Sequence, residues 1–331
     1  MINGKKKYRI LIAALSVLLV TVAAASLCIG RYSIMPADVF SWIGGSGGIG
    51  GSVFFDIRLP RICFAALGGA ALALAGTVFQ SLFRNPLVSP DVLGVTSGCS
   101  LGAAAAIVLF AEQSWLKQAG SFAAGILAVL LSLAVARSVR GDKTVGFVVS
   151  GLITGGLSSA LLMLLKYIAD PYKQLPAIDF WLMGGFYNVG WADVLNLLPV
   201  LGAAAAILLL LGWRLKVLAA GEEEARTLGI NTRAVRVAAI LCSTLMVASV
   251  VSIVGAVSWI GIFIPHIVRL LWGDDIHRAM PLSMLAGAAI LLAADTAARS
   301  IMTSELPISI LTSLIGAVFL AFLLTRKKKA L

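Results

Sequence analysis

Few residues of this chain have the types and spacing that catalysis or metal binding requires. The two histidines, His266 and His277, have no carboxylate or cysteine at the spacing of metal ligands, so we expect structural roles for them. The four cysteines are scattered through apolar segments, and no pair has the spacing of a redox or metal motif. A membrane-embedded enzyme would need a cluster of ligand or acid–base side chains, which this pattern does not offer.

Nucleotide chemistry is not indicated either. Residues 45–50 read GSGGIG and match the GxGxxG pattern, but a dinucleotide site needs a strand before it and a helix opening at it. This stretch lies in a predicted external loop, where a flexible linker is the better interpretation. The sequence contains no GxxxxGK[ST], so ATP would have to be handled by another chain. We expect no cofactor.

The most informative polar stretch is GEEEARTLG, residues 221–229, which lies between two long hydrophobic segments. Its three glutamates favour a helix N-terminus because they complement the partial positive charge there. Gly229 is a natural stop for that helix, and Asn231 can cap the next one. The residues alone leave two interpretations open: a short helix presented to a soluble partner, or an ordinary solvated connection.

The elements that carry this stretch are those of a membrane protein. The chain has 331 residues, is 60% hydrophobic and 12% charged, and has a mean hydropathy of +1.00. Soluble proteins have about 25% charged residues. Apolar runs of membrane-spanning length recur along the chain, and they are continuous rather than alternating, so we expect an all-α polytopic protein and not a β-barrel. The net charge of +11 reflects basic loops on one side of a membrane rather than binding of nucleic acid.

Ten spans are predicted, with both termini on the same side. A turn around Ser252, Gly255 and Ser258 would divide the long apolar stretch 234–272 into two passes. Most of the 26 Lys and Arg residues then fall on the side of the termini, which makes that side cytoplasmic. We expect the first span to remain uncleaved. The predicted spans are 8–29, 60–82, 91–110, 116–137, 144–168, 190–212, 234–254, 258–272, 279–300 and 306–325.

No carboxylate is predicted near the middle of a span. Asp193 and Asp295 lie toward the external ends of theirs. Since ion-coupled secondary transporters use intramembrane carboxylates, this counts against that class.

Several segments together resemble the permease subunits of the BtuC/FecCD family, the membrane components of ATP-binding-cassette (ABC) importers for vitamin B12, iron–siderophores and haem. Their order and spacing hold over roughly residues 50–325. The matching segments are Arg58-Leu59-Pro60-Arg61, Gly76 to Gln80, Asn85-Pro86-Leu87, Leu93-Gly94-Val95, Gly221 to Ile230, Ile264-Pro265-His266 with Arg269, Ala294-Asp295 with Arg299, and Glu305-Leu306-Pro307 with Leu314-Ile315-Gly316.

The resemblance implies a type II importer bundle that forms one permease domain over residues 1–331. It also implies a second permease copy or a paralogue, two cytoplasmic ATPase subunits and an external substrate-binding protein. The ATPase would seat on a coupling region within about residues 213–236, which favours the partner-facing interpretation of the acidic stretch. The coupling residues implied are Gly221, Glu222, Glu223, Glu224, Ala225, Arg226, Leu228 and Gly229.

Two further sets of site residues follow from the resemblance. The external arginines Arg58, Arg61 and Arg299 would receive carboxylates of the binding protein, a task that suits the fixed charge and bidentate geometry of arginine. The inner gate would include Asn85, Pro86 and Leu87, and a mildly polar pathway wall would be formed by Ser150, Thr154 and Ser158.

We therefore expect a multi-pass permease of the bacterial inner membrane, surrounded by lipid, that performs no covalent chemistry. Its cargo would be a metal chelate, an iron(III)–siderophore on the family pattern. The alternative is an ion-coupled secondary transporter.

Overall fold

The computed structural model describes residues 2–30, 32, 42, 48–110, 113–139 and 143–327, and among these it contains helices and no strand. Seven helices are long and apolar enough to cross a membrane, and three shorter apolar helices complete the ten predicted crossings in the described part of the chain. The long helices are α1 (Ile2–Cys28), α4 (Leu59–Leu82), α6 (Ser114–Ser138), α7 (Lys143–Ile168), α9 (Trp191–Leu210), α12 (Thr232–Val254) and α14 (Ile276–Ala298). The other three are α5 (Val95–Phe110), α13 (Ile260–Trp272) and α15 (Ile308–Lys327), of which the apolar part is Ile308–Phe322.

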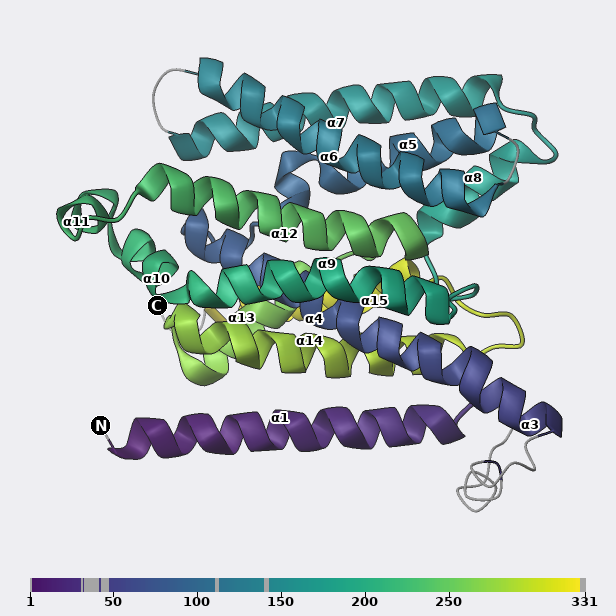
Figure 1. The fold of residues 1–331 in the computed structure, drawn as a ribbon, viewed down its shortest axis with the longest axis horizontal. Coiled ribbons are helices and arrows are strands. Elements are labelled where there is room, and N and C mark those ends of the chain that lie inside the picture. The colour runs from purple at the N-terminus through teal and green to yellow at the C-terminus, as the bar shows by residue number, and fades with distance from the viewer. Residues whose placement is uncertain are drawn as a thin grey trace.

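The crossing helices lie side by side along the long axis of the molecule (Figure 1). Helices α4, α12 and α14 form the interior, with 78%, 72% and 67% of their most apolar windows buried, whereas α1 has only 6% buried and lies at the edge. The start of α1, the end of α15 and the short helix α11 (Glu222–Thr227) lie at the same end of the bundle. That arrangement agrees with ten crossings and termini on one side.

Several short elements connect the crossings. Helix α3 (Gly48–Ser52) and the π-helical turn η1 (Val53–Arg58) lead directly into α4. Helices α8 (Gln174–Met183) and α10 (Gly212–Ala220) were not predicted, because neither is long enough to stand out as an apolar run. Part of the GSGGIG stretch lies outside the described residues, and its described end, residues 48–50, belongs to α3.

Close glycine contacts join α4 to its neighbours. A Cβ atom on Gly69 would lie 2.3 Å from the carbonyl oxygen of Gly287 in α14, and one on Gly76 would lie 1.9 Å from the carbonyl oxygen of Gly261 in α13. Such contacts let helix backbones approach in a membrane, where helix association depends on packing rather than on a hydrophobic driving force.

Replacing Gly76 by alanine should therefore destabilise the bundle. The new methyl group would meet backbone, which cannot rotate away, and overpacking of this kind costs about 1–3 kcal/mol or more. The readout is the melting temperature of the detergent-purified protein. Gly202→Ala in α9 is the matched control, since nothing lies within 4 Å of its added Cβ. Equal melting temperatures for the two variants would contradict the contact.

Two irregular segments enter the bundle from opposite ends. After α4, residues 83–94 turn back and rise through the short 3-10 helix η2 (Pro90–Leu93) before α5 begins. After α12, Gly255 turns with φ of +74° and residues 256–259 lead back to α13, so the division of the 234–272 stretch into two passes is confirmed. Helices α5 and α13 have 16 and 13 residues. They are about 24 and 20 Å long, less than the roughly 30 Å of a hydrocarbon core.

The two irregular segments meet against the middle of α4. The Cβ position of Gly261 lies 3.2 Å from the carbonyl oxygen of Leu72 and 3.8 Å from the Pro90 ring. Trp259, which precedes α13, has a left-handed φ of +71°. A Cβ on Gly316 of α15 would lie 2.7 Å from that tryptophan, so only glycine fits there. Non-helical backbone is thus concentrated at the centre of the bundle.

Candidate functional site

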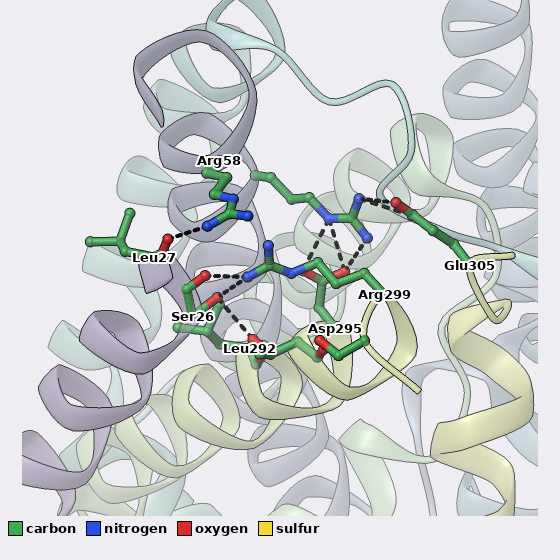
Figure 2. A network of polar contacts seen from close by, with 10 residues as sticks. Ser26, Leu27, Arg58, Leu292, Asp295, Arg299 and Glu305 are labelled. Atoms are coloured by element: carbon green, nitrogen blue, oxygen red, sulfur yellow. Dashed lines mark hydrogen bonds and ion pairs between the residues drawn. The ribbon is translucent and has the colours of Figure 1, made fainter. Parts of the chain in front are cut away.

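A buried cluster of charged groups ties together the ends of α1, α4 and α14 that lie away from α11 (Figure 2). Arg61, in the first turn of α4, donates through Nε and Nη2 to Asp295 of α14, with a shortest distance of 2.7 Å. Its Nη1 donates to Glu305, before α15, at 2.9 Å. One guanidinium therefore holds carboxylates from two separate segments.

The other two arginines of the cluster bind the end of α1. Arg299, at the end of α14, donates to the Ser26 hydroxyl at 2.7 Å and to the Ser26 carbonyl oxygen. Arg58, the last residue of η1, donates to the carbonyl oxygens of Leu27 and Cys28, the two residues that follow Ser26 at the end of α1. Carbonyls at a helix C-terminus have no partner within the helix, so these arginines cap α1.

The structure places all three predicted docking arginines inside the protein rather than on an open surface. Arg58, Arg61 and Arg299 are 4%, 7% and 6% exposed, and each has internal partners. In the described chain their contacts hold helix ends together. A direct role in docking stays a prediction, and it would require these internal contacts to be exchanged for contacts with the partner.

The coupling region forms a braced projection at the opposite end of the bundle. Helix α11 begins after Gly221 and ends at Thr227, and Gly229, with a φ of +74°, turns the chain two residues later. The Asn231 side chain accepts from the Ala234 amide at 3.0 Å. The predicted short helix, its glycine stop and its asparagine cap are confirmed. Glu222 binds Arg226 one turn on at 2.7 Å and Arg236 of α12 at 3.3 Å.

The residues of α11 divide into an inner and an outer set. Ala225 is fully buried and, with the braced Glu222, fixes the helix against its neighbours. Glu223, Glu224 and Leu228 are exposed, with Leu228 60% exposed. An apolar side chain beside two carboxylates on a solvent-facing helix is suited to contact a protein partner.

An ion pair attaches α10 to the bundle. Lys216 lies 3.0 Å from Asp275, the residue that precedes α14. Burial raises the pKa of Asp275, but the hydrogen bond from Lys216 and the nearby charges of Lys216 and Arg278 outweigh it, so the pKa lies below its ordinary value. The carboxylate is therefore charged at neutral pH, and α10 is tied to the start of α14.

The predicted gate residues lie at the start of the irregular segment that follows α4. The Asn85 amide donates to the Gln80 carbonyl at 3.1 Å, and its side chain accepts from the Leu87 amide at 3.0 Å. Leu87 is 49% exposed. Pro86 and Leu87 line a small crevice with Trp259, so the segment contacts the entrance of α13.

The structure places the predicted pathway residues of α7 inside the bundle of the single chain, and their role in the pathway stays a prediction. Ser150, Thr154 and Ser158 are 0%, 1% and 5% exposed. Ser150 lies 3.2 Å from Ser132 of α6, and Thr154 donates to the Ser150 carbonyl at 2.9 Å. These hydroxyls lie inside the bundle because helical periodicity turns the leucine-rich face of α7 outward; Leu152 and Leu157 are 71% and 50% exposed.

One charged residue that the sequence did not place lies halfway along the bundle. Asp91, in η2, shares a crevice with Leu72 near the middle of α4 and Val247 near the middle of α12. The prediction that no carboxylate lies at mid-depth is therefore wrong. Its cause is the assignment of residues 91–110 to one full span, which placed Asp91 at a membrane surface. The clue available in the sequence was Ser89-Pro90 directly before it, a signal for a helix boundary.

Ten crossing helices, irregular backbone at mid-depth and a braced projection at one end define a multi-pass membrane permease. Residues 17–326 match the FecCD transport family, and the chain belongs to this family. It is a permease of an ABC importer, a class in which separate subunits hydrolyse ATP.

Relatives support the same assignment, and their names refer to different cargoes. The chain is 38% identical to the molybdate import system permease protein MolB of Haemophilus influenzae, over 97% of each chain. It is 37% identical to a Helicobacter pylori permease named for iron chelatin transport, over 83% of each. A solved inward-facing ABC transporter assigned to the metal-chelate type superposes with a TM-score of 0.87 at 38% identity, covering 95% of this chain and 98% of that one.

Proposed function

We propose that this chain moves a metal chelate, an iron(III)–siderophore, from an external binding protein across the bacterial inner membrane to the cytoplasm. Two ATPase subunits supply the energy by docking on the α10–α11 region. A second permease copy or a paralogue completes the pathway. The end of the bundle that carries α11 and both termini is the cytoplasmic end.

The observation that carries this proposal is the projection formed by α10 and α11. Its outer face presents Glu223, Glu224 and Leu228, while Glu222 and Lys216 tie its inner face to α12 and to the start of α14. A partner that moves α11 therefore moves membrane helices through ion pairs and buried contacts. An ordinary solvated connection would need no such bracing.

The end of the bundle away from α11 is suited to contact the binding protein, and the side of the bundle is suited to contact lipid and the second permease subunit. The arginine cluster fixes the relative positions of α1, α4 and α14, and so shapes the surface that receives the binding protein. Along the side of the bundle, α7 and α15 expose large apolar residues such as Leu157 and Leu314. We assign this face to lipid and to the second permease subunit.

Energy supply separates this function from ion-coupled transport. The test is uptake into proteoliposomes that contain the permease, its genomically adjacent ATPase and a binding protein loaded with a radiolabelled ferric siderophore. We expect accumulation only with ATP and all three proteins. Accumulation by the permease alone under a proton or sodium gradient would establish the secondary-transporter alternative instead.

A further inference from the structure

Asp91 lies halfway along the crossing helices. It shares a crevice with Leu72 and Val247, which are near the midpoints of α4 and α12. The following residues pack beside the middle of α7: the Cβ position of Gly94 lies 3.3 Å from the Gly155 amide, and that of Gly151 lies 1.6 Å from the Val92 carbonyl oxygen. Contacts with the middle parts of α4, α12 and α7 therefore all place Asp91 and the residues after it halfway along the bundle.

Its side chain is exposed in the single chain and is held in place only by neutral groups. The carboxylate accepts hydrogen bonds from the Thr96 hydroxyl and, at 3.4 Å, from the Ser89 hydroxyl. No Lys, Arg or His of the described residues forms an ion pair with it. The carboxyl group thus has no basic partner within the part of the chain that the structure describes.

A carboxylate on irregular backbone cannot face hydrocarbon. At membrane depth, non-helical backbone occurs only where protein covers it or where it lines a water-filled cavity, because lipid cannot satisfy its polar groups. Charged side chains at this depth likewise face a bundle interior or an aqueous path. Since Asp91 is exposed and follows the Asn85–Leu87 turn after three residues, water on the transport route is the environment that fits both facts.

We infer that Asp91 gives the transport pathway a negative potential at mid-depth, and that the pathway therefore admits neutral or cationic metal chelates and repels oxyanions. This inference rests on the proposed function and narrows its cargo. The low dielectric of the surroundings strengthens the effect of a single charge. A second permease copy would bring a second carboxylate and deepen the potential.

A cysteine-labelling experiment tests the potential without knowledge of the cargo. In the assembled transporter in nanodiscs, with its four native cysteines replaced by alanine, Leu87→Cys is reacted with cationic and anionic methanethiosulfonate reagents of similar size. With Asp91 present we expect the cationic reagent to be favoured. Asp91→Asn should lower the ratio of cationic to anionic rates about tenfold, whereas Asp170→Asn, an exposed carboxylate beyond α7, should leave it unchanged.

Two results of the labelling experiment would contradict the inference about Asp91. An unchanged ratio in Asp91→Asn, or a cysteine at position 87 that reacts with neither reagent although the transporter couples ATP hydrolysis to uptake, would overturn it. Asp91→Glu keeps the charge and should keep the ratio, which separates charge from local misfolding. Loss of ATP dependence in uptake would count against the proposed function, while the labelling ratio would still report on Asp91.

Discussion

Replacing Asp295 by alanine should lower the stability of the purified permease by about 3–5 kcal/mol, since removal of one partner leaves a buried charge without compensation. Arg61 would keep only Glu305, and Arg299 would lose the carboxylate that lies 3.9 Å from its Nε. The expected result is a large drop in melting temperature and in the yield of monodisperse protein, measured by fluorescence-detected size exclusion after heating.

Asp179→Ala is the control for this prediction. Its carboxylate lies 2.6 Å from Lys166, an even shorter ion pair, but the two side chains are 42% and 33% exposed. Exposed pairs contribute about 0–1 kcal/mol because solvent screens them. If Asp295→Ala and Asp179→Ala had equal melting temperatures, the arginine cluster would not hold the helix ends as we describe.

Reversing the charge of Glu223 and Glu224 together, as Glu223→Lys with Glu224→Lys, should abolish stable association with the ATPase. Both side chains lie on the outer face of α11, so the bundle should fold normally, while like charges at a protein contact cost several kcal/mol. We expect at least a hundredfold weaker binding and loss of ATP-driven uptake. The measurements are co-purification and binding by biolayer interferometry.

Two further variants serve as comparisons for the doubly reversed protein. Asp170→Lys, an equally exposed reversal at the other end of the bundle, should leave ATPase binding unchanged. Glu222→Gln should act differently, because Glu222 braces α11 against Arg236 and its loss should weaken coupling more than binding. Normal co-purification of the doubly reversed protein would refute the assignment of α11 as the docking helix.

Hydropathy predicts most of this architecture because each apolar run must satisfy its backbone within one helix. The ten crossings, the division at Gly255 and the helix over residues 222–227 all follow from local composition. The local sequence also predicts the glycine stop at Gly229 and the asparagine cap at Asn231, since both act within a few residues of a helix end.

The surroundings of the site residues depend on contacts that local pattern does not contain. Arg61 is buried because Asp295 lies opposite it, 234 positions away in the sequence. Ser150 and Thr154 face inward because α6 offers Ser132, while the sequence shows only that α7 has a polar stripe. Asp91 reaches mid-depth because residues 83–94 bend into the bundle against Gly151, a close approach visible only in three dimensions.

The contact between α1 and α14 also has a consequence for biogenesis. Arg299 reaches the Ser26 hydroxyl from a helix that ends 270 positions later, at Ala298 against Cys28. At about 5–20 residues per second, the ribosome needs roughly 15–50 s to make that interval. Throughout that interval only Arg58 is available to cap the carbonyls of Leu27 and Cys28, and Ser26 gains its Arg299 partner only when the ninth crossing arrives.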